Sequence, residues 1–202
     1  IIIAFEGHRL LIDTGAPISV ANFSPLVIDG ISHSVAKSYM GVTPESLSKS
    51  VGTQIAALVG ADILNQYDIV IEPEKNEFFI TREELPLAGT NLELDSFMGI
   101  PILEAKFNQE TVRMFFDTGA KLSYLGSDLT ADYNPAGEEK DFYPGMGEFV
   151  TRVFEIEFLL ASERLCLKFG NLPEALQTML LMADTAGILG TALFETHKIQ
   201  LA

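Results

Sequence analysis

The chain has 202 residues, of which 48% are hydrophobic and 20% are charged, a composition typical of globular rather than disordered or fibrous proteins. It holds 28 aspartates and glutamates against 13 lysines and arginines, which gives a net charge of −15. Because such a charge repels nucleic-acid phosphates and anionic lipid, it argues against nucleic acid and membrane surfaces as partners.

The first half of the chain opens with an apolar run that ends at an aspartate. Residues 10–20 read LLIDTGAPISV, which predicts a strand followed by a tight Asp-Thr-Gly-Ala turn. Thr43 before Pro44 is typical of an N-cap and a first helical position, so a short helix is expected there. Further on, LVGADIL (58–64) contains a glycine motif, and YDIVI (67–71) alternates apolar positions as a half-buried strand does.

A stretch with proline, glycine and charged residues lies near the middle of the chain. Residues 81–96 read TREELPLAGTNLELDS, which is typical of a linker. The sequence therefore predicts an N-terminal lobe at residues 1–84, a linker at 85–94 and a C-terminal lobe at 95–202.

The second half repeats the landmarks of the first in the same order. A second Asp-Thr-Gly-Ala turn begins at Asp117, 104 positions after Asp13 (117 − 13). GNLPEAL (170–176) answers GVTPESL (41–47) with an offset of 129 at the proline (173 − 44), and ILGTALF (188–194) answers LVGADIL with an offset of 130 at the glycine (190 − 60). An internal repeat of this kind predicts an all-β fold with short helices, built as two lobes related by a pseudo-twofold axis.

The second copy carries about 25 additional residues between its aspartate turn and its proline (129 − 104). Residues 138–160 predict two strands around the turn PGMG (144–147), because apolar residues alternate with glutamates along the second strand. RLCLKF (164–169) predicts a further strand, in which we expect Cys166 to be a small core residue.

Features elsewhere in the chain bear on compartment and cofactors. Cys166 is the single cysteine, so no intramolecular disulfide can form, which favours a reducing compartment such as the cytoplasm. The three histidines lie far apart and lack zinc-ligand spacing, so we expect neither a metal site nor a cofactor. The longest apolar run (178–194) is interrupted by Asp184 and is shorter than a membrane span, so we expect a soluble protein. Asp184 begins Asp-Thr-Ala-Gly, whose glycine is displaced by one residue, and we expect no third turn there.

The two Asp-Thr-Gly-Ala turns, each with an apolar-Gly motif further along its own half, resemble those of the aspartic peptidases, especially the retropepsin-like branch. The resemblance covers nearly the whole chain. It implies two acid-protease lobes and a catalytic pair, Asp13 and Asp117, that hydrolyses peptide bonds without a metal or a covalent intermediate. Two carboxyl groups this close cannot both ionise, so one acts as base toward a water while the other acts as acid.

The same resemblance implies roles for neighbouring residues. The threonines of the two turns hydrogen-bond across the twofold axis, and the glycines let the backbone approach closely. The supporting turn residues are Thr14, Gly15, Ala16, Thr118, Gly119 and Ala120. The hairpin of the second half resembles a flap that closes over substrate, and its residues are Tyr143, Pro144, Gly145, Met146 and Gly147.

Ala16 and Ala120 stand where many pepsin-like enzymes have serine or threonine. A hydroxyl at this position donates a hydrogen bond that favours the charged carboxylate, and alanine does not donate. The sequence therefore predicts a less acidic working range than that of pepsin-like relatives.

The chain also departs from the retropepsin pattern. Retropepsins are homodimers, whereas this chain holds both turns, so it resembles a fused dimer, and we expect a monomer that acts on a peptide or protein substrate. In the first half, residues 25–41 are too few for a full flap, which predicts a more open cleft. Three alternatives stay open: a peptide-binding or assembly module with little or no activity, a dimer in which each copy pairs with another molecule, and a plain surface hairpin in place of the flap.

Overall fold

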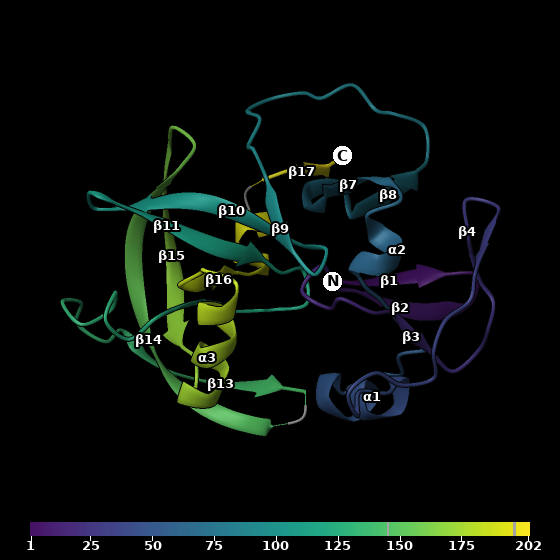
Figure 1. Cartoon of the computed structure of the whole chain (residues 1–202), viewed down its shortest axis with the longest axis horizontal. Coiled ribbons are helices and arrows are strands. Elements are labelled where there is room, and N and C mark those ends of the chain that lie inside the picture. Colours follow the sequence, from purple (N-terminus) through teal and green to yellow (C-terminus); the bar gives the residue numbers. More distant parts are fainter. Residues whose placement is uncertain (145, 196) are drawn as a thin grey trace.

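The computed structural model describes residues 1–144, 146–195 and 197–202, and these are arranged mainly as β-strands with a few short helices (Figure 1). The predicted all-β fold is therefore confirmed. One large cluster of buried apolar side chains extends through both halves of the chain, from Leu10 and Ile12 in the first half to Phe154 and Leu189 in the second.

The first half is built around a four-stranded sheet in the order β1-β2-β6-β3. Strand β2 ends one residue before Asp13, and β6 runs parallel to it, with Ile12 opposite Val59. This pairing carries the glycine motif that follows β6 to the side of the aspartate turn. The elements of this half are β1 (Ile2–Phe5), β2 (His8–Ile12), β3 (Val20–Ala21), β4 (Leu26–Ile28), β5 (Ile31–His33), α1 (Pro44–Val51), β6 (Ala57–Val59), α2 (Ala61–Leu64), β7 (Asp68–Glu72), the 3-10 helix η1 (Pro73–Lys75) and β8 (Glu77–Thr81).

The second half is built around an eight-stranded sheet in the order β13-β14-β15-β12-β16-β11-β10-β9, and β14 also pairs with β10. Strand β11 ends one residue before Asp117 and runs parallel to β16, with Phe116 opposite Leu189. The arrangement around the second turn thus matches that around the first. The elements are β9 (Asp95–Phe97), β10 (Ile100–Phe107), β11 (Glu110–Phe116), β12 (Ser123–Leu125), β13 (Gly137–Tyr143), β14 (Gly147–Leu160), β15 (Glu163–Asn171), α3 (Glu174–Met182), β16 (Gly187–Leu189), the 3-10 helix η2 (Thr191–Glu195) and β17 (Ile199–Leu201).

The two halves share a third sheet, in which the last strand of the chain joins strands of the first half (Figure 1). Its order is β17-β7-β8, with Leu201 opposite Ile69 and Ile199 opposite Ile71. No helix or strand lies between Thr81 and Asp95, a stretch that contains the predicted linker. The lobe boundaries at residues 84 and 95 stay a prediction.

The predicted helices and the predicted hairpin are present. Helix α1 begins at Pro44 with Thr43 as its N-cap, and Thr43 and Ser46 form a capping box. Strands β13 and β14 pair from Gly137 opposite Val153 to Tyr143 opposite Gly147. Over the last part of β14, Phe154, Ile156, Phe158 and Leu160 are buried and the glutamates between them are exposed, as the alternation predicts.

The expectation for Cys166 is wrong, because its side chain is exposed rather than part of the core. Strand β15 turns alternate side chains to opposite faces, and Cys166 shares its face with Arg164 and Lys168. Leu165 and Leu167 occupy the other face and pack against the large core.

Candidate active site

The two aspartate turns meet, and each carboxyl group lies against the glycine of the opposite turn. A Cβ atom added to Gly15 would overlap the carboxyl group of Asp117, and one added to Gly119 would overlap that of Asp13. Glycine is therefore required at both positions by the close approach of the turns. The structure brings together the two aspartates that the sequence singles out, Asp13 and Asp117.

The threonines of the two turns form four matched hydrogen bonds across the junction. Thr14 N–H donates to Thr118 Oγ1 and Thr118 N–H donates to Thr14 Oγ1, both at 3.0 Å. Each hydroxyl then donates to a carbonyl of the opposite half, Thr14 to Phe116 at 2.7 Å and Thr118 to Ile12 at 2.8 Å. Both threonines are buried, so these bonds are shielded from water and hold the turns in one geometry.

Each glycine motif is hydrogen-bonded to the turn of its own half. In the first half, Asp13 N–H donates to the carbonyl of Val59 at 3.0 Å and Ala61 N–H donates to that of Ala16 at 2.8 Å. In the second half, the same bonds join Asp117 to Leu189 at 3.0 Å and Thr191 to Ala120 at 2.9 Å. The backbone on both sides of each aspartate is therefore held by a neighbouring strand end.

Two serines support the turns and were not among the residues predicted for the site. Ser19 Oγ accepts from Gly60 N–H at 2.9 Å, and Ser123 Oγ accepts from Gly190 N–H at 3.0 Å. Each serine lies six positions after its aspartate, and this repeated spacing is the sequence signal that identifies the pair.

The first half adds a carboxylate to this network. Asp62 Oδ1 accepts from Ser19 Oγ at 2.6 Å and from Ser19 N–H at 2.9 Å. Ala192 occupies the corresponding place in the second half, two residues after the glycine. The support of the two turns therefore differs at this one carboxylate.

The ionisation of Asp13 is affected by its burial and by the neighbouring carboxyl group. Burial, the charge of Asp117 and a hydrogen bond between the two carboxyl groups hold the pKa of Asp13 well above its usual range. The Asp117 carboxylate accepts from Gly119 N–H at 2.7 Å and from Ala120 N–H at 3.2 Å. One proton shared between the two groups is the state that this arrangement favours.

Tyr143, the last residue of β13, is the hairpin residue whose ionisation is affected by the aspartate pair. Burial, followed by the charges of Asp117 and Asp13, raises the pKa of the Tyr143 phenol, so the ring lies within electrostatic range of both carboxyl groups. Tyr143 packs beside the cluster that contains Leu122 and Leu176, and its hydroxyl lies 3.8 Å from Met179 Sδ.

The remaining predicted flap residues follow Tyr143 at the end of the hairpin. Pro144 is half-buried, Met146 is exposed, and Met146 N–H donates to the carbonyl of Tyr143 at 3.1 Å. Gly147 begins β14 with a positive φ of 91°. Gly145 lies outside the described residues. Substrate binding by these residues stays a prediction.

A hydrogen bond that sequence reasoning missed ties this hairpin to the second turn. The Tyr124 hydroxyl, on β12, donates to Asp141 Oδ2 on β13. Burial and this hydrogen bond raise the pKa of Tyr124, which keeps its hydroxyl protonated and able to donate. The two residues are 17 positions apart, and no local pattern pairs them.

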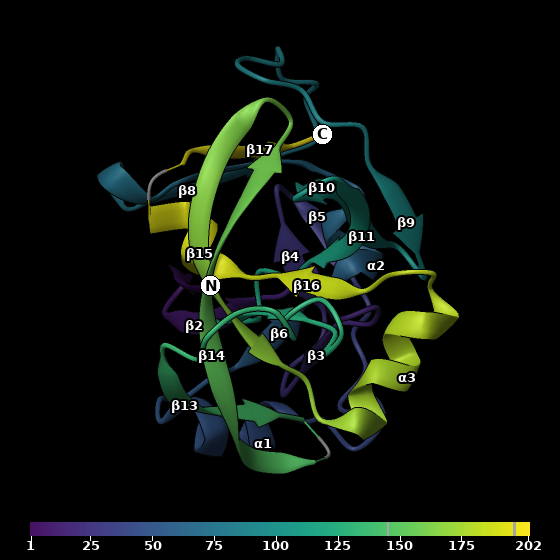
Figure 2. The same ribbon diagram turned by 90° about the vertical axis from the view of Figure 1, so that its left-hand side faces the viewer.

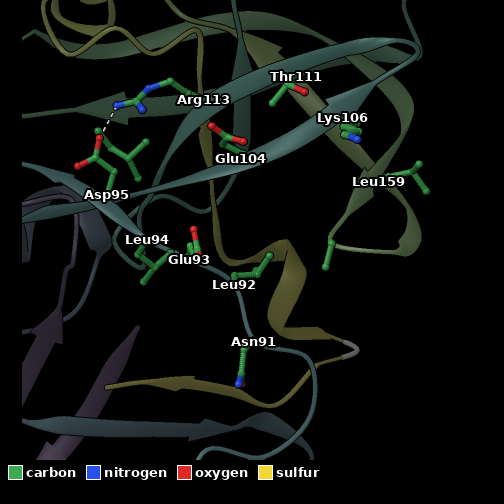
Figure 3. A pocket seen from close by; sticks show the side chains of 12 residues that line it. Asn91, Leu92, Glu93, Leu94, Asp95, Glu104, Lys106, Thr111, Arg113 and Leu159 are labelled. Atoms are coloured by element: carbon green, nitrogen blue, oxygen red, sulfur yellow. Dashed lines mark hydrogen bonds and ion pairs between the residues drawn. The ribbon is translucent and has the colours of Figure 1, made fainter.

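A separate cavity of about 440 Å³ lies beside strands β9, β10 and β11, against the stretch that precedes β9 (Figure 3). Its lining includes Leu92, Glu104 and Arg113. The Arg113 guanidinium is paired with Asp95 at 2.7 Å, and Asp184 lies 3.8 Å from it. Neither turn aspartate lines this cavity.

Two searches of the described residues bear on metals and membranes. Within residues 1–144, 146–195 and 197–202, no three histidine, cysteine or carboxylate side chains are grouped so that they would hold a metal ion. Across the same residues, none of the helices combines the length and apolar character that a bilayer crossing requires.

No protein-family model matches the chain, and no curated protein matches it. Among solved structures, it is similar to a foamy viral protease-reverse transcriptase in complex with an RNA/DNA hybrid, at 13% identity over 51% of this chain and 13% of that chain, with a TM-score of 0.39. It is also similar to the protease of simian foamy virus (mac), at 15% identity over 45% of this chain and 88% of that chain, with a TM-score of 0.34. A third is the prototype foamy virus protease-reverse transcriptase, at 12% identity over 51% and 12% of the respective chains, with a TM-score of 0.36. Likeness at this level assigns no activity, so function has to be inferred from the geometry of the site.

Proposed function

We propose that this protein is an aspartic endopeptidase that hydrolyses peptide bonds with a water held between Asp13 and Asp117. The observation that carries the proposal is the approach of the two turn carboxyl groups, each of which lies against the glycine of the opposite turn, where Asp117 raises the pKa of Asp13. Such a pair supplies a base and an acid at one point, which peptide hydrolysis requires.

The reaction uses both protonation states of the pair. The ionised carboxylate takes a proton from the water as its oxygen attacks the peptide carbonyl carbon, and the protonated partner hydrogen-bonds to the carbonyl oxygen. The tetrahedral intermediate breaks down when a carboxyl proton passes to the leaving nitrogen and the C–N bond breaks. The two carboxyl groups perform every proton transfer, so the proposed reaction needs no cofactor.

The second half supplies the proposed cover over this reaction. Tyr143, the last residue of β13, lies within electrostatic range of both carboxyl groups, which supports the β13–β14 hairpin as this cover. A hairpin in this place shields a bound peptide from water and fixes its backbone. Both carboxyl groups come from one chain, so we expect a monomer to suffice.

The raised pKa of Asp13 extends the proposed activity toward neutral pH. The mechanism requires one proton on the pair, and activity is lost as pH rises far enough to remove it. Because the pKa of Asp13 lies well above its usual range, we expect the alkaline limit to lie at higher pH than for an unperturbed carboxyl group. A pH–rate profile confined to strongly acid pH would contradict this.

Peptide-library cleavage tests the proposal. We expect the parent protein to cleave, and Asp13→Asn and Asp117→Asn each to lose at least a thousandfold in kcat/KM, because each removes one partner of the acid–base pair, and paired groups act as a unit. Asp184→Asn is the matched control, since Asp184 also precedes a threonine but its carboxylate is 96% exposed.

The outcomes separate the rival functions. Retained cleavage in either turn variant would exclude the two-carboxylate mechanism. No cleavage by the folded parent across the pH range, together with measurable peptide binding, would favour a protease-like binding module. Thermal unfolding of each variant shows whether the fold is intact.

A further inference from the structure

The two halves share one parallel pairing, but they differ in the number of residues between the paired positions and in the number that follow them before the next helix. Val20 on β3 is bridged in parallel to Ala36, and Tyr124 on β12 pairs in parallel with Gly170. The two paired residues are 16 positions apart in the first half (36 − 20) and 46 positions apart in the second half (170 − 124). The first half therefore lacks 30 residues at the place where the second half has its hairpin.

Beyond that pairing, the first half is the longer one. Its helix α1 has Thr43 as N-cap, seven positions after Ala36 (43 − 36). In the second half α3 has Pro173 as N-cap, three positions after Gly170 (173 − 170). The first half thus adds four residues directly before its helix.

A tight turn, Tyr39-Met40-Gly41-Val42, lies in this added segment. Tyr39 N–H donates to the Val42 carbonyl at 3.0 Å, and Val42 N–H donates back to the Tyr39 carbonyl at 2.8 Å. Met40 and Gly41 have positive φ values of 47° and 82°, which is the geometry of a two-residue hairpin turn. The Met40 side chain at the tip is 81% exposed.

The turn is anchored beside the first aspartate. Tyr39 and Val42 pack against a cluster that includes Leu11, and Ala16 packs against the same cluster. Leu11 and Ala16 flank Asp13 in the sequence. The exposed tip is therefore carried by residues that share a core cluster with the aspartate turn.

The second half presents its hairpin in the same relation to its own aspartate. Tyr143 packs against the cluster that contains Leu122, and Phe115 packs against the same cluster. Phe115 and Leu122 lie on either side of Asp117 in the sequence. Figures 1 and 2 both place α1, which follows the Met40 turn, beside the end of β13. The Met40 turn and the β13–β14 hairpin are thus each anchored on a core cluster beside the aspartate turn of their own half.

We propose that the Met40 turn replaces the flap that the first half lacks, and that Met40 is a specificity-determining residue which contacts an apolar side chain of the substrate peptide. The inference rests on the proposed peptidase function. A methionine side chain is unbranched and polarisable, so it adapts to differently shaped apolar partners. Met146, 40% exposed next to the hairpin's turn, faces solvent from the other half and offers the same kind of contact.

Charge placed at the tip tests this assignment. Met40→Lys and Met40→Glu keep an unbranched side chain at a positive φ that a non-glycine residue already tolerates. Met98→Lys and Met98→Glu are the matched controls, because Met98 also has a positive φ, 54°, is 61% exposed and is followed by a glycine, in the turn between β9 and β10. Thermal unfolding verifies that all four variants fold as the parent does.

Cleavage-site profiling with a peptide library is the readout. We expect Met40→Lys to raise relative kcat/KM for acidic side chains, and Met40→Glu for basic ones, each roughly three- to fivefold, as for a partly solvated charge pair. The change should be confined to the substrate position or positions whose side chains reach the tip of the Met40 turn, because the new charge is local to that tip. The Met98 variants should keep the parent profile.

The outcomes distinguish this inference from the function on which it rests. Cleavage by the parent with a Met40 profile identical to that of the Met98 controls would overturn the role of Met40 and leave the peptidase intact. A shift of equal size at every substrate position would overturn it as well, because it would reflect the net charge of the protein rather than a contact at the tip. No cleavage by the folded parent would overturn the peptidase itself, and the inference with it.

Discussion

Val20 in the first half and Tyr124 in the second occupy the same place, seven residues after the aspartate of their turn. Each makes a parallel pairing, Val20 with Ala36 and Tyr124 with Gly170. Val20 is a buried apolar side chain with no polar partner to meet. Tyr124 is also buried, but its hydroxyl donates to Asp141 on the hairpin that only the second half possesses. The Tyr124 hydroxyl is therefore a feature of the hairpin rather than of the core that the two halves share.

The parts that the halves share lie at the junction of the turns. Each half contributes a threonine, a glycine and a serine to matched hydrogen bonds around the carboxyl pair. The parts that differ are Asp62, the Met40 turn and the β13–β14 hairpin. Asp62 joins the network through Ser19 in the first half, and the other two lie outside the junction. The same substitution made in both halves should therefore change the free energy of unfolding equally at the threonines of the junction, and unequally where the halves differ.

The largest expected effect is at the threonines. Thr14→Val or Thr118→Val leaves a buried N–H group and a buried carbonyl without partners, and we expect each to lower the free energy of unfolding by about 2–4 kcal/mol. Because the four bonds are matched, the two losses should agree within about 1 kcal/mol. Urea unfolding measures both, and Thr111→Val, on the exposed face of β11, serves as the control. A large loss from only one of them would break the equivalence of the halves.

A smaller effect, opposite in sign, is expected from Asp13→Asn. Because the pKa of Asp13 is raised on folding, the folded protein retains a proton that the unfolded chain has already released, so stability falls as pH rises through this window. Above the folded pKa the carboxylate weakens the fold, and the substitution removes that penalty. We expect the variant to melt at higher temperature than the parent near neutral pH.

The increase in melting temperature caused by Asp13→Asn should become smaller as pH falls. It should vanish below the ordinary aspartate pKa of about 3.9. Thermal melts at a series of pH values measure this, with Asp184→Asn as the exposed control. A difference between variant and parent that does not vary with pH would show that Asp13 has no raised pKa.

Local sequence patterns were sufficient for the turns, the helix starts and the hairpin. An apolar run ending in Asp-Thr-Gly, a Thr-Pro pair before α1 and the alternation along β14 each act over a few residues, so the sequence displays them directly. The place of Cys166 was also available from alternation, since it falls between Leu165 and Leu167 on the opposite face. A small apolar side chain favours the core, but at Cys166 the alternation of the strand decides which face the side chain occupies.

Contacts between distant positions were not predictable in the same way. Ser19 and Asp62 are 43 positions apart, and a surface-type carboxylate gives no sign in the sequence that it meets a buried serine. The offsets between the two copies of the repeat give only a net difference in length. The first half lacks 30 residues before Ala36 and has four extra residues before Thr43, and the smaller number partly cancels the larger. The Met40 turn therefore emerges only once the strand pairing is known.

Tyr124→Phe should have the next largest effect. It removes the hydroxyl bonded to Asp141, so we expect a loss of about 1–2 kcal/mol in the free energy of unfolding. Under the proposed function, the looser hairpin lowers kcat/KM about five- to tenfold while the pH profile stays that of the parent. Tyr133→Phe is the control, since its hydroxyl has an exposed partner, Asn108, at 3.5 Å. Unchanged cleavage in Tyr124→Phe would show that the hairpin is positioned without this bond.

The smallest effect concerns the helix starts, where the halves differ again. Thr43 caps α1 through its hydroxyl, which accepts from Ser46 N–H at 3.1 Å, whereas Pro173 at the start of α3 provides no side-chain cap. Thr43→Ala should lower the free energy of unfolding by about 1 kcal/mol. Thr43→Ser keeps a capping hydroxyl, so the difference between Thr43→Ala and Thr43→Ser in urea unfolding isolates the cap. Because Thr43 directly follows the Met40 turn, loss of the cap should also weaken the substrate preference assigned to Met40. An unaltered cleavage profile in Thr43→Ala would show that the turn is held by the packing of Tyr39 and Val42 alone.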